Sequence, residues 1–352
     1  MDSRSVVVVG AGLAGTVLGR TLQRRGWSVQ IFQHTRPGAA TPVAAGLWNP
    51  INFFRLIPGW RVEEALPAML DFFESEERDL GQPFLNHRPY VQPILHQEHK
   101  LQWDAAAANY PRWLEANWQG AGAAGLHAYE RTWGVLAWGL VREAGWLDVE
   151  GYIQACRLRW QSQGRWVDAL WTEAEQVERS SVVDARGVFA HSGSEFLARL
   201  KPTKGELVEF TLPNGPASVM IKRDLFLQPL GGDRYRAGAT FEWHDFSPGS
   251  TEQGKAKLHA GLVQLLGEDL SGAYDFEYKA GLRPASHDRR PYVGAHPGGG
   301  NRWVFNGFGA KGVLLAPLLA SELTAAMEGK GVLNPEADTK RLGPFLSGEL
   351  EA

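Results

Sequence analysis

The first 15 residues contain the feature that most constrains the fold. Residues 6–15 read VVVVGAGLAG, in which four β-branched residues lead into glycines spaced as G-x-G-x-x-G. The valine run is typical of a strand buried on both faces. In a strand–turn–helix unit, Gly10 permits the tight turn, Gly12 lets a phosphate approach the backbone, and Gly15 lets the helix pack on the strand.

The segments that follow complete a dinucleotide-binding unit. Residues 13–25 have helical spacing, and residues 27–32 (WSVQIF) predict a second strand. The turn residues Ala11, Leu13 and Ala14 would surround the helix N-terminus, whose free N–H groups and partial positive charge favour phosphate. The pattern therefore predicts a pyrophosphate site, although an ordinary glycine-rich turn has the same spacing.

The residue after the second strand departs from the usual pattern. An acidic residue normally holds the ribose hydroxyls there, but this chain has Gln33. An amide accepts one hydrogen bond and donates another, so ribose binding by Gln33 remains possible. A second interpretation places a 2′-phosphate of NADP type beside His34 or Arg36.

Composition excludes several classes. The chain has 352 residues, a formal charge of −3 and no long basic run, which disfavours a nucleic-acid partner. One cysteine, Cys156, forbids an internal disulfide and fits a reducing compartment. The apolar N-terminus lacks a basic leader, and no apolar stretch is long enough to span a membrane, so we expect a cytoplasmic protein. No metal-ligand spacing is present.

The middle of the chain changes character. Asp148 is the expected N-cap of a helix over 149–163, and strands are expected at 166–171 and 181–189. Short alternating segments over 205–245 predict an antiparallel sheet, unlike the parallel pattern of the first 35 residues. Ser250 and Gln253 then form a possible capping box for a helix ending near residue 267.

A second glycine turn lies near the C-terminus. Residues 281–294 read GLRPASHDRRPYVG, and a strand is expected at 303–305. The turn NGFGAKG, residues 306–312, precedes an apolar helix over 313–327. This turn again presents a helix N-terminus with little side-chain bulk, where the backbone can approach a ring system closely.

These motifs in this order resemble the FAD-dependent D-amino-acid oxidase family, and the likeness is strongest to its glycine oxidase and sarcosine oxidase-like branch. The matching stretches are VVVVGAGLAG, AAGLWNP, WLDVEGY, KPTKGELV, GLRPASHDRRPYVG and NGFGAKGVLLAP. The resemblance implies an α/β (α+β overall) protein with a Rossmann-like FAD-binding domain of discontinuous segments and an antiparallel-sheet substrate domain. The implied FAD domain comprises residues 1–80, 146–200 and 281–352, and the substrate domain comprises residues 81–145 and 201–280.

The resemblance also implies roles for individual residues. Ala45, Gly46 and Leu47 match the loop beside the isoalloxazine ring, and Val167 would contact adenine through its backbone. Gly187 follows a strand that would face the nucleotide. The pyrimidine end of non-covalent FAD would lie against Gly307, Gly309, Ala310, Lys311 and Gly312. The two residues expected to act in catalysis are Arg283, which matches a substrate-carboxylate arginine, and Lys311, which would stabilise negative charge on the flavin.

The implied activity is oxidation of an amine or amino acid at its C–N bond, by hydride transfer to flavin N5. Oxygen or another electron acceptor would reoxidise the flavin. Two alternatives remain at this stage. One is a flavoprotein of the same fold acting on an alcohol, a modified nucleoside or a natural-product intermediate, and the other is a redox-silent binding protein. Arg283 as an interdomain ion-pair residue and Lys311 as a solvated side chain are the simpler interpretations of those two residues.

Overall fold

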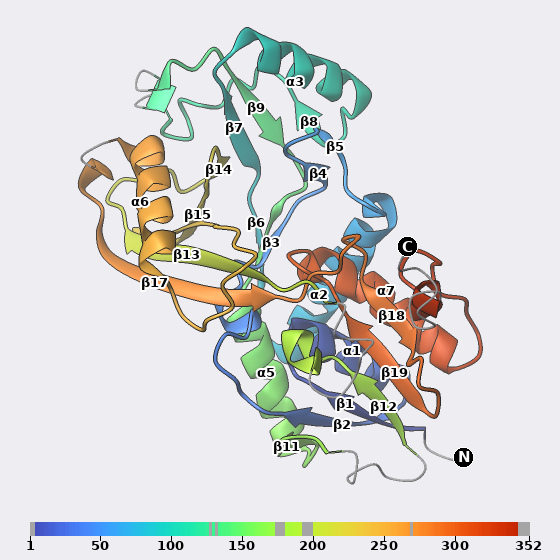
Figure 1. Ribbon diagram of the computed structural model, residues 1–352. Helices are drawn as coiled ribbons and strands as arrows, with labels where there is room; N and C mark the ends of the chain where they lie inside the picture. The colour runs from blue at the N-terminus through green and yellow to red at the C-terminus, as the bar shows by residue number, and fades with distance from the viewer. Residues whose placement is uncertain are drawn as a thin grey trace, which may run out of the picture.

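The computed structural model describes residues 4–126, 129–130, 133–172, 180–191, 200–267 and 270–343. Two sheets dominate it, and they lie at different ends of the molecule in Figure 1. One is mostly parallel and contains the N-terminal strand, and the other is mostly antiparallel. This arrangement confirms the predicted fold class, while the exact domain boundaries remain a prediction.

The parallel sheet is assembled from three separate parts of the chain. Its strand order is β11 (Trp166–Asp168), β2 (Ser28–Gln33), β1 (Ser5–Val9), β12 (Ser181–Asp184), β19 (Arg302–Asn306) and β18 (Tyr292–Ala295). All neighbours pair in parallel except β18 and β19. The central strand β1 has apolar residues packed on both faces, as the valine run predicts.

Helices cover one face of this sheet and meet in a common apolar core. They are α1 (Leu13–Arg24), α2 (Val62–Leu80), α5 (Val149–Ser162) and α7 (Gly312–Met327). Leu18 and Leu22 of α1 are fully buried in the core that also contains Leu319 of α7. Burying each such side chain stabilises the fold by roughly 1.5–3 kcal/mol. Asp148 caps α5 as predicted, because its Oδ1 accepts a hydrogen bond from the Gly151 N–H at 3.0 Å.

The second sheet has eight strands. Their order is β17 (Tyr274–Arg283), β13 (Thr203–Thr211), β16 (Arg234–Gly238), β15 (Phe226–Gly231), β14 (Met220–Lys222), β7 (Tyr90–Ile94), β9 (Ala137–Val141) and β8 (Leu114–Glu115). Helix α6 (Glu252–Leu266) packs on one face, where Leu258 and Leu262 meet Val208 and Phe210. Residues of the opposite face, such as Leu207, line a large cavity.

Smaller elements complete the described chain. They are α3 (Gln97–Asn109), the sheet of β3 (Leu47–Trp48), β10 (Gly145–Leu147) and β6 (Leu85–His87), the pair β4 (Ile51–Asn52) and β5 (Ile57–Pro58), and the 3-10 turns η1 (Thr41–Val43), η3 (Gly187–His191), η5 (Leu270–Gly272) and η6 (Thr339–Leu342).

Three local predictions are wrong. The strand expected over 166–171 ends at Asp168, because its partner β2 ends at Gln33, which pairs with Asp168. The strand expected over 181–189 ends at Asp184, and the chain turns at Gly187, where φ is +61°, into η3. Helix α6 is capped by Thr251 rather than Ser250, since the Thr251 Oγ1 accepts from the Gly254 N–H at 2.9 Å. Thr251 takes the cap position because the buried Glu206 carboxylate accepts hydrogen bonds from both the N–H and the hydroxyl of Thr251.

Candidate active site

One cavity of about 900 Å³ is lined by residues of both sheets. This volume lies near the upper end of the range of small-molecule sites, about 300–1,000 Å³. The glycine turn after β1 lines one part, and the second glycine turn before α7 lines another. The cavity therefore joins the two motifs that the sequence places some 300 residues apart.

The glycines of the first turn leave no room for side chains. A β carbon on Gly15 would lie 1.8 Å from the Gly10 carbonyl oxygen, and one on Gly10 would lie 2.7 Å from the Ala185 carbonyl oxygen. Gly10 also has a φ of +101°, which favours glycine. Gly12 is the N-cap of α1 and lines the cavity, so this helix begins at the cavity wall. A helix N-terminus in this position favours a phosphate group.

Two side chains brace the same turn. The Ala11 N–H donates to Gln33 Oε1 at 2.6 Å, and the Leu13 N–H donates to Thr41 Oγ1 at 3.2 Å. With its oxygen engaged in this way, Gln33 has its NH2 group left to donate to a ligand. Gln33 lines the cavity, so its position fits the predicted ribose contact.

Aromatic and cationic side chains surround the outer end of the cavity. The Arg36 guanidinium carbon lies 5.5 Å from the centre of the Phe189 ring, and that of Arg157 lies 5.3 Å from the centre of the Trp166 ring. All four residues line the cavity. Val167 itself does not, but its neighbours Trp166 and Asp168 do, and β11 pairs with β2 beside Phe32.

The inner end is formed by backbone with positive φ. Gly46 has a φ of +69°, and a β carbon there would lie 2.1 Å from the Leu147 carbonyl oxygen. The fully buried Gln228 of β15 donates through Nε2 to the Ala45 carbonyl oxygen at 3.2 Å, which ties this loop to the second sheet. Opposite the loop, Gly309, with a φ of +55°, precedes the start of α7. Both segments line the cavity with small residues, which leaves space for a flat ring system.

Arg283 projects into the cavity without an acidic partner among the described residues. Its Nη1 donates to the Thr240 carbonyl oxygen at 3.4 Å, and its guanidinium carbon lies 4.7 Å from the centre of the Phe241 ring. Burial lowers the pKa of Arg283 to about 10. The interdomain ion-pair interpretation is therefore wrong for the described part of the chain, and the unpaired cation favours an anionic ligand.

Lys311 occupies a different setting. It is the N-cap residue of α7, its side chain is exposed, and it does not line the cavity. Desolvation and the positive charges of Arg290 and Arg289 lower its pKa. The catalytic role of Lys311 stays a prediction, and the geometry places the helix N-terminus closer to the cavity than the ammonium group.

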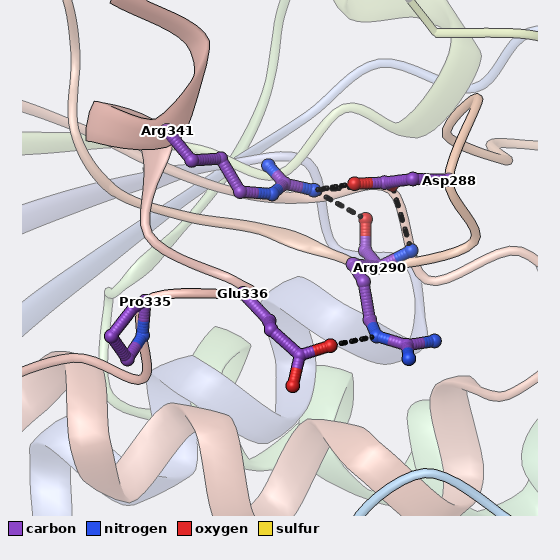
Figure 2. A pocket seen from close by; sticks show the side chains of 5 residues that line it. All are labelled: Asp288, Arg290, Pro335, Glu336 and Arg341. Carbon is purple, nitrogen blue, oxygen red and sulfur yellow. Dashed lines mark hydrogen bonds and ion pairs between the residues drawn. The ribbon is translucent and has the colours of Figure 1, made fainter.

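A second, smaller pocket lies beside these arginines. Figure 2 shows Arg290 paired with Glu336, and Arg341 paired with Asp288, around a space bounded by Pro335. The Arg290 Nε lies 2.8 Å from Glu336 Oε2, and the Arg341 Nη2 lies 3.0 Å from Asp288 Oδ2. Each charge has a partner of opposite sign, so this pocket is a structural ion-pair cluster.

The cavity collects most of the predicted site residues. Those lining it are Ala11, Gly12, Leu13, Ala14, Gln33, His34, Arg36, Ala45, Gly46, Leu47, Gly187, Arg283, Gly309, Ala310 and Gly312. Those outside the lining are Gly10, Gly15, Val167, Gly307 and Lys311. Gly10 and Gly15 act through backbone packing, and Gly307 has a φ of +80° in the turn after β19.

The sequence-based prediction missed several lining residues. Tyr90, Lys222, Phe226 and Phe241 come from strands or loops of the second sheet, and they carry no local motif. Thr41 was also missed, although a hydroxyl residue just before a proline in the AAGLWNP region was a weak signal. Among the described residues, no group of three or more His, Cys, Asp or Glu side chains is arranged to hold a metal ion.

Comparison with known proteins identifies the family. The model of the DAO family, described as FAD dependent oxidoreductase, matches residues 5–326. The chain belongs to this family. Glycine oxidase of Pseudomonas aeruginosa is 25% identical over 360 residues, which cover 93% of this chain and 96% of that protein. The crystal structure of glycine oxidase from Geobacillus kaustophilus superposes with a TM-score of 0.75 at 19% identity, over 97% of this chain and 98% of that chain.

A further relative is larger. The bifunctional tRNA 5-methylaminomethyl-2-thiouridine biosynthesis protein MnmC of Pseudomonas putida is 24% identical, over 92% of this chain and 56% of that protein. Together these relationships support FAD-dependent oxidation of an amine or amino acid over the alternative functions. The described part of this DAO family member contains no helix with both the length and the apolar character needed to cross a membrane.

FAD is the cofactor of the family, and the cavity fits it. The glycine turn and the N-terminus of α1 suit the pyrophosphate, and Gln33 lies where the ribose is expected. Gly46 and Gly309 line the cavity without a side chain, where the flavin ring is expected. His34 and Arg36 line the nucleotide end, but the family relationship gives no support to a 2′-phosphate of NADP type there.

Proposed function

We propose that the enzyme oxidises a small amine that carries a carboxylate, and that Arg283 binds this carboxylate. The observation that supports the proposal is the unpaired guanidinium in the cavity lining, held there with its pKa lowered by burial. A carboxylate can pair with such a group through two parallel hydrogen bonds. A bound carboxylate would thus neutralise the charge of Arg283, which has no acidic partner among the described residues.

Aromatic side chains also line the cavity. Phe241 lies against the Arg283 guanidinium, Phe53 and Phe226 line the same cavity, and Tyr90 contributes a phenol. Burial raises the pKa of Tyr90 well above its ordinary value, so the hydroxyl stays neutral and can donate a hydrogen bond. An apolar wall opposite a carboxylate site orients the carbon that bears the nitrogen.

When bound, FAD supplies the hydride acceptor. The protein's contribution is orientation and electrostatics. Arg283 would hold the carboxylate, the apolar wall would exclude water, and the N-terminus of α7 would favour negative charge near the pyrimidine end of the ring. Among the described lining residues, His34 is the only histidine and lies at the nucleotide end, so the substrate amine would bind in its neutral form. The oxidised product is an imine, which water hydrolyses.

Anaerobic flavin bleaching by a panel of glycine, sarcosine, proline and D-amino acids tests this proposal. We expect Arg283→Met to raise KM for the active substrate steeply while FAD stays bound. Arg55→Met is the matched control, because Arg55 is exposed and lies outside the cavity lining. An unchanged KM in Arg283→Met, or a panel in which no carboxylated amine bleaches the flavin, would contradict the proposal.

The electron acceptor and the cellular location belong to the same proposal. Reoxidation by oxygen or by another acceptor is distinguished by measuring oxygen consumption against ferricyanide or quinone reduction. A cytoplasmic location is consistent with a single cysteine that is buried and free.

A further inference from the structure

Two glycines face each other across the ladder between β13 and β17. Gly205 pairs directly with Gly281 in this antiparallel register. Directly opposed residues of a sheet project their side chains to the same face, so two glycines here open a gap on one side of the sheet. Neither glycine has a positive φ, so the backbone itself does not require them. Both positions therefore need glycine because neighbouring groups fill the volume that a side chain would occupy.

The guanidinium of Arg283 occupies the space at Gly205. A β carbon on Gly205 would lie 2.0 Å from Nη2, 2.2 Å from Cζ and 2.3 Å from Nη1 of Arg283. All three distances are shorter than any non-bonded carbon contact, so a side chain at position 205 and the observed guanidinium exclude each other. Arg283 is two residues beyond Gly281, and its side chain turns back along the strand into this gap.

The segment over residues 39–47, which we call the flavin loop, contributes the groups that occupy the space at Gly281. A β carbon there would lie 2.4 Å from Val43 Cγ2 and 3.1 Å from the Ala39 carbonyl oxygen. The next residue, Leu282, donates its N–H to the Gly38 carbonyl oxygen at 2.9 Å. The segment that crosses β17 here continues into the loop containing Gly46. The two glycines thus accommodate two different partners in neighbouring positions.

Little else holds Arg283 in place. Of its five N–H donors, only Nη1 has a hydrogen bond within the described structure, and that bond to the Thr240 carbonyl oxygen is long at 3.4 Å. Phe241 covers the guanidinium from one side, and its own side chain is 59% exposed. Without an acidic partner in the described chain, the position of the cation depends on the shape of the gap.

We propose that Gly205 is a positioning residue that sets the place of the Arg283 guanidinium, and so the affinity of the cavity for a carboxylate. The inference rests on the proposed carboxylate-binding role of Arg283. Gly281 has a separate role, which is to seat the flavin loop. A methyl group at position 205 displaces the cation toward the cavity or toward Phe241, whereas a methyl group at 281 displaces the loop.

The experiment compares Gly205→Ala with Gly281→Ala, because these two positions pair directly between β13 and β17. Glycolate affinity of the FAD-loaded enzyme is measured by calorimetry, and the flavin-to-protein ratio is measured by absorbance. We expect Gly205→Ala to weaken glycolate binding about 13- to 160-fold, the value of a charge-assisted hydrogen bond of about 1.5–3 kcal/mol, with normal flavin content. We expect Gly281→Ala to lower the flavin content.

A double variant separates positioning from a general structural effect. In an Arg283→Ala background the gap is empty, so Gly205→Ala should cause no further loss of glycolate affinity. The thermal stability lost in Gly205→Ala should also be recovered in the double variant. If Gly205→Ala alone does not fold, folding of the double variant supports the inference, and failure of both to fold overturns it.

The remaining outcomes are distinct. Wild-type affinity in Gly205→Ala, or additive losses in the double variant, would overturn the role of Gly205 while leaving the proposed function intact. A wild-type enzyme that binds glycolate but is bleached by no carboxylated amine would overturn the proposed function alone. A wild-type enzyme that binds no carboxylate would overturn both.

Discussion

Replacement of Gln33 tests how the nucleotide end of the cavity works without the usual acid. The Ala11 N–H donates to Gln33 Oε1 at 2.6 Å, and Ala11 is only 5% exposed, so water cannot easily replace the amide. Gln33→Leu removes this acceptor and the NH2 group that we expect to contact the ribose. Gln33→Glu restores the acidic residue that the motif normally carries.

The magnitudes follow from two separate hydrogen bonds. Loss of the bond to Ala11 affects the protein with or without FAD, and leaving that N–H unpaired should lower the free energy of unfolding by about 1–3 kcal/mol. Loss of the expected hydrogen bond to the ribose would affect only FAD binding, and at about 0.5–1.5 kcal/mol it should weaken binding roughly 2- to 12-fold. In Gln33→Glu the bond from Ala11 becomes charge-assisted, so we expect apoprotein stability to rise by about 1 kcal/mol and FAD affinity to hold or increase.

Both quantities are measured on apoprotein. Urea unfolding gives the stability, and titration with FAD, followed by quenching of flavin fluorescence, gives the affinity. The control is the same pair of substitutions at Gln30, which lies on the same strand but is exposed. Unchanged apoprotein stability in Gln33→Leu, or weaker FAD binding in Gln33→Glu, would refute this reasoning.

Three further predictions concern the inner end of the cavity. Because burial lowers the pKa of Arg283 to about 10, glycolate affinity should be constant at neutral pH. Above pH 10 binding must take up a proton, so the affinity should fall about tenfold per pH unit. Calorimetry at a series of pH values measures this profile, and a flat profile past pH 10 contradicts the prediction. Gly46→Ala places a β carbon 2.1 Å from the Leu147 carbonyl oxygen at a φ of +69°, so it should cost at least about 1–3 kcal/mol in urea unfolding and lower the flavin-to-protein ratio. Lys311→Met tests the predicted stabilisation of reduced flavin. An exposed charge is worth about 0.2–1 kcal/mol, so anaerobic reduction should slow about 1.4- to 5-fold relative to a Lys330→Met control. An unchanged rate would remove Lys311 from the mechanism.

Local signals predicted the structural elements around the first glycine turn and the cap of α5. The valines of β1, the glycines of the first turn and the Asp148 cap each depend on residues within one turn or strand, so their spacing is visible in the sequence. The Ser250 prediction failed for the opposite reason. The partner that selects Thr251 is Glu206, 45 residues away, and no local pattern reveals it.

Of the cavity lining that the second sheet contributes, the sequence predicted only Arg283. Lys222, Phe226 and Tyr90 reach the cavity because β14, β15 and β7 are neighbours, an order that follows from long-range pairing. The importance of Gly205 likewise depends on a register between strands some 70 residues apart. Periodicity predicts that such segments are strands, but it does not predict which residues become paired.

The position of β17 separates two parts of the cavity lining by how closely each is joined to the second glycine turn. Immediately after Arg283, the Pro284 carbonyl oxygen accepts from the Gly309 N–H at 2.9 Å, so the end of β17 is hydrogen-bonded to the second glycine turn. If Arg283 binds the substrate carboxylate as proposed, substitutions there should alter cofactor and substrate alignment together. Lys222 is four strands away, roughly 19 Å at usual strand spacing, and shares no backbone with the flavin turn. Substitutions in β14, β15 and β7 can therefore change the lining of the cavity without moving the strand that carries Arg283.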